Sequence, residues 1–123
     1  MTAVTVPLVI IALLLLPSPG AAQSYQENPD TAVINKQSRD AYVGARRTPD
    51  ISIIMAHQAL SASRQSGYSR GVADASLALG MAYLAKYNQG DSARYYNELA
   101  LSTCEETGDL TGKARACYGL AYV

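Results

Sequence analysis

The sequence predicts an all-α fold, a solenoid of helix–turn–helix repeats with about two and a half units. After residue 30, helix-length stretches are separated by Pro, Gly, Asn and Asp, the residues that break or cap helices. Strict alternation of apolar and polar residues, which would indicate strands, is absent. In addition, residues 38–82 and 79–123 match at 11 of 45 positions when the chain is shifted by 41 residues.

The first 22 residues form a segment of their own. They carry no charged side chain, and an apolar run over residues 4–16 is followed by Pro17, Pro19 and two alanines. A membrane-spanning helix needs roughly 20 apolar residues, which is more than this run supplies. An apolar run, a helix breaker and small residues together are typical of a secretory signal peptide, here cleaved after Ala22. The sequence therefore predicts export to the periplasm or another extracytoplasmic space. An uncleaved membrane anchor is the alternative.

Five helices are expected in the rest of the chain, each bounded by residues with a known capping preference. An N-cap aspartate can accept hydrogen bonds from the orphan N–H groups of the first turn. Glycine ends a helix because it adopts the left-handed conformation without a Cβ penalty. Asp30, Asp50 and Asp91 are the expected N-caps, and Gly67 and Gly108 the expected ends. A polar linker over residues 23–30 precedes helices over residues 31–46, 51–66, 69–87, 92–107 and 110–123.

The 41-residue repeat follows the packing residues of these helices. The matching positions fall on caps and on small or large core residues rather than on the polar faces, as in Ala41/Ala82, Tyr42/Tyr83, Ala59/Ala100, Gly71/Gly112 and Leu79/Leu120. Such self-similarity is typical of solenoids, in which each helix pair packs only on its neighbours. A plain helical bundle with coincidental similarity is the alternative.

The best-formed unit resembles a known repeat family. Leu79, Gly80 and Tyr83 on one helix, with Ala93 and Ala100 on the next, resemble the two helices of a tetratricopeptide repeat. The resemblance extends over all five expected helices. The period is longer, 41 residues against about 34 in the family. The other units depart from the pattern at Arg39, Ser52 and Ala121. The resemblance implies a concave groove, lined by the first helix of each pair, that binds peptides or partner domains.

The groove implied by this resemblance is lined by the stripe left over once the small residues face their neighbours. The residues on that stripe are Lys36, Asp40, Asp74, Leu77, Met81, Leu84, Arg115, Tyr118 and Tyr122. Its apolar members would form a patch rimmed by charge, as exposed interaction sites commonly do. Packing between repeats is the alternative role of the same residues. The expected partner is a protein or a peptide.

Composition and motifs exclude several other functions. Ten basic and ten acidic side chains cancel, which leaves no electrostatic footprint for nucleic acid. His57 is the single histidine, and no nucleophile–base pair, phosphate loop or set of metal ligands accompanies it. We therefore expect no enzyme activity, no cofactor and no metal in this region. Membrane contact is expected only through the signal peptide or a downstream segment.

The two cysteines leave two interpretations open. Cys104 and Cys117 lie on consecutive helices at equal distances from the turn near Leu110, so antiparallel packing would place them opposite each other. Export permits a disulfide, which also needs Cα atoms within about 7 Å. The repeat places Ser63 and Ser76 at the equivalent positions, which favours small buried residues instead.

Two functions follow from these observations. The first is an exported interaction or scaffold module that binds a peptide or partner domain in its groove. The alternative is the N-terminal sensor region of a longer membrane-bound signalling protein. Exported repeats of this long kind resemble the N-terminal regions of bacterial sensor histidine kinases and membrane-bound transcription regulators. The chain stops at Val123 inside a helix whose second partner is missing, so we expect a longer protein with any catalytic domain downstream.

Overall fold

The computed structural model describes residues 28–86 and 88–123, and these fold into α-helices without any strand. The helices are α2 (Pro29–Gly44), α3 (Pro49–Gln65), α4 (Ser69–Ala85), α5 (Gly90–Thr107) and α6 (Leu110–Ala121). The all-α prediction is therefore confirmed. The predicted signal peptide and most of the predicted linker lie outside the described residues. None of the helices in the described part combines the length and apolarity needed to cross a bilayer.

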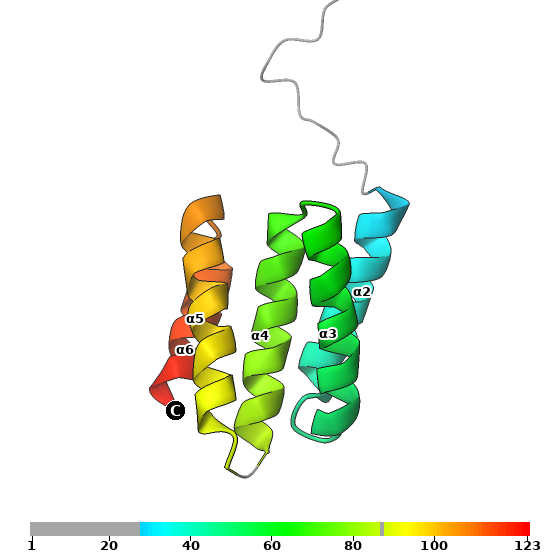
Figure 1. Cartoon of the computed structure of the whole chain (residues 1–123). Coiled ribbons are helices and arrows are strands. Elements are labelled where there is room, and N and C mark those ends of the chain that lie inside the picture. Colours follow the sequence, from blue (N-terminus) through cyan, green and yellow to red (C-terminus); the bar gives the residue numbers. More distant parts are fainter. Residues whose placement is uncertain (1–27, 87) are drawn as a thin grey trace, which may run out of the picture.

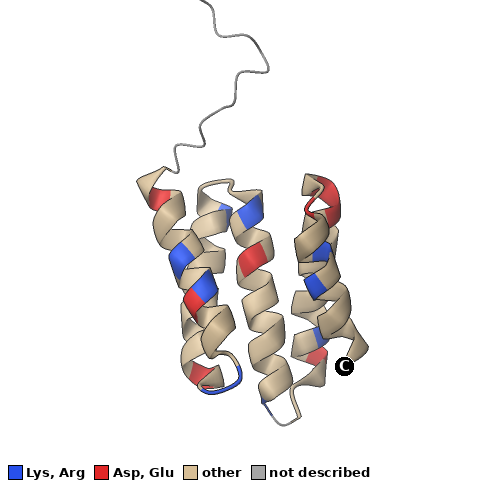
Figure 2. Cartoon of the chain, turned by 180° about the vertical axis from the view of Figure 1, so that it is seen from behind, with Lys and Arg blue, Asp and Glu red and all other residues tan. Residues whose placement is uncertain are grey.

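Helix α4 is the centre of the arrangement. It packs against α2, α3, α5 and α6, whereas α2 meets neither α5 nor α6. Successive helices run in opposite directions, so α3 and α5 run the same way on one side of the molecule (Figure 1). Seen from behind, α2, α4 and α6 run side by side along the other face (Figure 2). This second face carries the residues predicted to bind a partner.

Helices α2, α3 and α5 begin two residues earlier than predicted. Pro29 and Pro49 stand in the first turns of α2 and α3, where a missing N–H costs nothing and the fixed φ angle suits a helix. The Oδ1 atom of Asn28 caps α2 by accepting a hydrogen bond from the Asp30 N–H at 3.1 Å. The predicted caps lie in the first turn instead: Asp30, Asp50 and Asp91. An acidic side chain there still stabilises the helix through its dipole.

The ends of the helices agree better with the sequence. Gly67 and Gly108 have φ angles of 65° and 72°, the left-handed conformation predicted for both. Asp109 caps α6 by accepting a hydrogen bond from the Gly112 N–H at 2.9 Å. In the turn before α5 the left-handed residue is Asn88, with φ 64°. Helices α2, α3, α4 and α6 end one or two residues before the predicted positions.

Positions related by the 41-residue shift make the same contact twice. Gly71 at the start of α4 lies against the side chain of Ser63 on α3. The equivalent Gly112 at the start of α6 lies against the side chain of Cys104 on α5. In both places a Cβ atom would collide with the neighbouring side chain. The shift therefore relates two helix–helix contacts as well as two stretches of sequence.

Asn97 on α5 holds three helices together. Its side chain is only 2% exposed, and its Nδ2 atom donates a hydrogen bond to the Ala93 carbonyl at 2.9 Å. Gly80 from α4 and Gly119 from α6 both face this amide, and a Cβ on Gly80 would lie 2.6 Å from Asn97 Cγ. There is no room for a methyl group at either glycine.

We expect Gly80→Ala and Gly119→Ala each to lower the free energy of unfolding by about 1–3 kcal/mol, the usual cost of overpacking. Part of that cost is offset, because alanine has a helix propensity about 1 kcal/mol better than glycine. Gly90→Ala is the matched control, since a Cβ there meets nothing within 4 Å. Urea denaturation followed by circular dichroism measures the three variants. Equal stability of all three would contradict the role given to Asn97.

Candidate functional site

Two hollows follow one another along the face of α2, α4 and α6. The first, about 480 Å³, is lined mainly by Ser38, Arg39, Tyr42, Arg70, Asp74 and Arg115, and is called the arginine hollow below. The second, about 340 Å³, is lined by Arg46, Met81, Leu84, Ala85, Tyr118 and Tyr122, and is called the tyrosine hollow. Seven of the nine predicted groove residues line one or the other: Asp74, Leu77, Met81, Leu84, Arg115, Tyr118 and Tyr122.

The other two predicted groove residues do not reach the hollows. Lys36 and Asp40 lie on the exposed surface of α2 and form an ion pair with 2.6 Å between Nζ and Oδ2. Such a pair, one helical turn apart and in contact with solvent, contributes only about 0.3–0.5 kcal/mol. The two residues thus pair with each other on α2 and line neither hollow.

The predicted exposure of Leu77 is wrong. The helical stripe places it on the accessible surface, but it is 3% exposed and packs against Ala100 and Ala116. The physical reason is the position of α4, which other helices contact on several sides. Leu77 therefore forms the floor of the arginine hollow and belongs to the core. A charged substitution at this position would test folding rather than binding.

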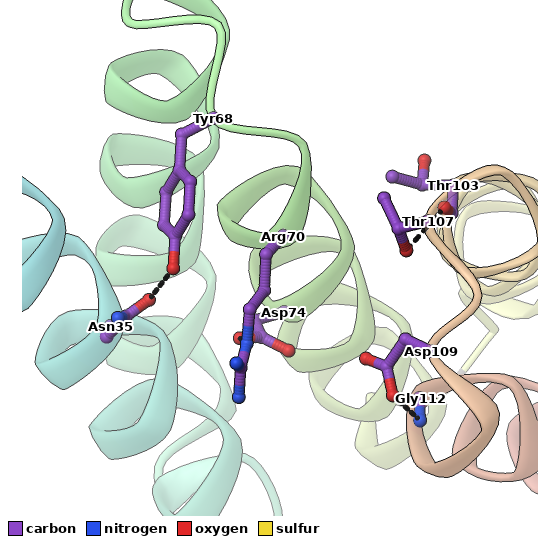
Figure 3. A network of polar contacts seen from close by, with 8 residues as sticks. All are labelled: Asn35, Tyr68, Arg70, Asp74, Thr103, Thr107, Asp109 and Gly112. Carbon is purple, nitrogen blue, oxygen red and sulfur yellow. Dashed lines mark hydrogen bonds and ion pairs between the residues drawn. The ribbon is translucent and has the colours of Figure 1, made fainter. Parts of the chain in front are cut away.

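Positive charge dominates the arginine hollow. Arg39, Arg70 and Arg115 come from α2, α4 and α6, while Asp74 is the single carboxylate among the lining residues. Arg70 Nε lies 3.8 Å from Asp74 Oδ2, and Figure 3 shows the two side chains next to each other on α4. Burial raises the pKa of Asp74, and the nearby Asp109 adds to this effect against the opposing pull of the arginines.

Side chains from α2 border the same hollow. Tyr42 lies beneath the guanidinium of Arg115, with 5.5 Å between Cζ and the ring centre, which is a cation–π distance. The Tyr68 hydroxyl donates a hydrogen bond to Asn35 Oδ1 at 2.9 Å at the upper rim (Figure 3). These contacts join α2 to α6 and to the start of α4. The hollow thus has walls that are held by side chains of different helices.

The tyrosine hollow is more apolar. Tyr118 and Tyr122 have ring centres 4.8 Å apart and are exposed, while Met81 and Leu84 are half-buried. A hydrogen bond with Tyr122 lowers the pKa of Tyr118, an effect that Arg46 reinforces, and the same bond raises the pKa of Tyr122. Exposed aromatic rings over flexible apolar side chains make a surface that adapts to different partners.

A cluster of aromatic rings between α3, α4 and α5 goes beyond the sequence prediction. His57 Nε2 lies 3.4 Å from the Tyr83 hydroxyl, and the ring of Tyr83 stacks on that of Tyr96 at 5.6 Å between centres. The His57 ring meets Tyr96 edge-on at the same distance of 5.6 Å. Burial raises the pKa of Tyr96. The repeat pattern marks Tyr83 as a packing residue, but no sequence signal connects His57 to either tyrosine.

The structure contains no bridge between the two cysteines. Both are free thiols, with Cys104 buried and Cys117 exposed. Cys104 packs against Gly112, whereas Cys117 lies on the surface of α6, so the two side chains do not face each other. The interpretation as a small buried residue holds for Cys104 alone. Across residues 28–86 and 88–123, no three His, Cys, Asp or Glu side chains gather as a metal site requires.

We expect one of the two thiols to react with a maleimide in the folded protein and both to react after denaturation. Burial, reinforced by Asp109 and Asp74, raises the pKa of Cys104 to about 11, so this thiol is both inaccessible and protonated at neutral pH. Cys117 is accessible. Mass spectrometry counts the labels. Absence of labelling in denatured, unreduced protein would show a disulfide and contradict the structure.

We expect Asp74→Asn to stabilise the protein near pH 7 and to lose this advantage as the pH falls. The folded chain holds the Asp74 proton more tightly than the unfolded chain, whose pKa is near 3.8, so ionisation with rising pH lowers stability. The substitution removes that cost. The free energy of unfolding at pH 7 and pH 4 measures the effect, with the exposed Glu98→Gln as control. The same Asp74→Asn gain at both pH values would contradict it.

No protein-family model, curated protein or solved structure matches this chain. The tetratricopeptide resemblance therefore depends on the residues given above, and a function must be proposed from the face itself.

Proposed function

We propose that residues 28–123 form a protein-interaction module, a tetratricopeptide-like solenoid that binds a peptide segment along the face of α2, α4 and α6. One observation carries the proposal. Seven of the residues that the helical stripe assigns to a groove line two consecutive hollows on that face. A stripe that served only to pack repeats together would be covered by neighbouring helices, and of these seven residues only Leu77 is fully buried.

The order of the helices supports the solenoid part of the proposal. Alternate helices run in the same direction along one face (Figure 2), and the Gly71–Ser63 contact recurs as the Gly112–Cys104 contact 41 residues later. In a solenoid, such a face is extended and accepts an elongated partner. The location in an exported compartment is also part of the proposal and depends on the apolar leader of the sequence.

The chemistry of the two hollows suits a peptide better than a small apolar ligand. The tyrosine hollow offers Met81 and two exposed aromatic rings, which fit one apolar or aromatic side chain. The arginine hollow, next along the same helices, is polar and charged. A peptide with an apolar residue beside a polar one would place the apolar side chain in the tyrosine hollow and the polar one in the arginine hollow. No feature of the described residues favours the sensor-region alternative over this function.

The proposal is tested with peptides selected from a random display library against the immobilised protein. We expect Met81→Glu to weaken binding of the selected peptides about tenfold or more, because it places a charge in the apolar contact, equivalent to at least about 1.4 kcal/mol. Ile54→Glu is the matched control: Ile54 is 60% exposed on α3, away from both hollows. Fluorescence anisotropy gives the dissociation constants, and circular dichroism checks that both variants fold.

Two results would overturn the proposal. One is that the library yields no peptide that binds with saturation. The other is that Met81→Glu and Ile54→Glu leave the dissociation constant equally unchanged, since the face would then play no part in the binding.

A further inference from the structure

The arginine hollow contains more positive charge than its own residues neutralise. Arg39, Arg70 and Arg115 converge on it, against the one carboxylate of Asp74. Arg70 makes a long ion pair with Asp74, and within residues 28–86 and 88–123 neither Arg39 nor Arg115 has a carboxylate within 4 Å. Arginine presents its donors in a planar fork that matches a carboxylate in two-point contact. The three arginines are exposed, so the excess positive charge of the hollow is accessible to an anion.

The hydroxyl of Ser38 is a second and independent observation. Ser38 lines the same hollow, is 2% exposed, and its Oγ atom has no hydrogen-bond partner. It is the only such buried side-chain atom found among the described residues. A buried polar group without a partner is unfavourable and calls for an explanation. A ligand atom that accepts a hydrogen bond in the hollow would supply the missing partner.

Other buried hydroxyls in this protein show what Ser38 does not do. Ser63, Ser76 and Thr103 each donate a hydrogen bond to the carbonyl four residues earlier, at 2.7, 2.6 and 2.8 Å. This local bond is the usual way for a serine or threonine inside a helix to satisfy its hydroxyl. Ser38 stands in the middle of α2 and makes no such bond. Ser38 thus places an unpaired buried donor at the wall of the hollow.

We propose that the arginine hollow binds a carboxylate of the peptide, held by Arg39 and Arg115 and by a hydrogen bond from the Ser38 hydroxyl. The proposal rests on the proposed function, since it specifies one residue of the peptide that lies on this face. The carboxylate belongs either to an acidic side chain or to the peptide's C-terminus, and the chemistry of recognition is the same for both. Asp74 opposes binding, because its negative charge faces the same space.

The first experiment uses small probes, so it does not depend on any peptide. N-acetylglutamate amide carries one side-chain carboxylate, N-acetylglycine carries one terminal carboxylate, and N-acetylglutamine amide is the uncharged analogue of the first. Each is titrated into the ¹⁵N-labelled full chain at low salt, because about 0.1 M salt screens charges beyond about 10 Å. We expect saturable amide shifts around the arginine hollow with at least one carboxylate and none with the glutamine probe. The carboxylate probe that binds more tightly shows whether the hollow takes an acidic side chain or a C-terminus.

Variants separate recognition from folding. We expect Arg39→Gln and Arg115→Gln each to raise the dissociation constant of the carboxylate probe about tenfold, because each removes a charge-assisted hydrogen bond. Ser38→Ala should raise it about fivefold. Arg94→Gln is the matched control, since Arg94 is exposed on α5 and lines neither hollow. Asp74→Asn is expected to strengthen binding. Ser38→Ala is expected to keep or raise the melting temperature of the free protein, which a serine with a structural role would not allow.

Several outcomes would overturn the inference. Shifts with both carboxylate probes no larger than those with the glutamine probe, or equal losses for Arg39→Gln and Arg94→Gln, would show that no carboxylate site exists. Inorganic phosphate binding more than ten times tighter than either carboxylate would assign the hollow to another anion. In selected peptides, unchanged affinity after every acidic residue is replaced and the C-terminus is amidated would refute the inference while leaving the interaction module intact. Failure of peptide selection with positive probe titrations would leave the carboxylate site but refute the interaction module, and with it the peptide as the source of the carboxylate.

Discussion

The close approach of α5 to both α4 and α6 at Asn97 is the constraint on which the rest of the structure depends. Two glycines face this one side chain from opposite helices, so three helices are held at a single point. One repeat earlier, Ala56 stands at the position of Asn97 and Ala78 at that of Gly119, both fully buried, whereas the equivalent of Gly80 is the exposed Arg39. The later repeat thus has a larger residue opposite a glycine where the earlier repeat has two alanines. Because protein interiors tolerate little empty or excess volume, Asn97 fits only because both residues that face it are glycines.

The sequence was sufficient to predict the helices because their signals are local. Gly67 and Gly108 end their helices through their own left-handed backbone, which depends little on where the surrounding helices lie. The starts of the helices were less well predicted. Pro29 and Pro49 belong to the first turn, and an aspartate one residue later is compatible with a cap or with a first-turn position. Only the backbone geometry distinguishes these two.

Long-range packing explains what the sequence could not show about the face. The helical stripe groups Asp74, Met81 and Leu84 because their spacing places them on one side of α4, where each lines one of the two hollows. The burial of Leu77 depends on the neighbours of α4, which the stripe does not contain. Ser38 was overlooked for the same reason, since a missing hydrogen bond has no signature in sequence.

Cys117 illustrates the limit of arguments from repeats. It matches Ser76, which is buried because α4 has helices around it, whereas Cys117 is exposed on α6. The repeat therefore predicts which residues share a position in a helix, and the neighbours of that helix decide whether they share an environment.

The contact between Arg115 and Tyr42 has a mechanical consequence. The backbones of α2 and α6 do not meet, so across the face this side-chain contact joins them directly. A cation–π pair near solvent contributes about 0.5–1 kcal/mol, comparable to thermal energy. The Arg115–Tyr42 contact is therefore a small addition to the packing of α2 and α6 on α4, which places both helices.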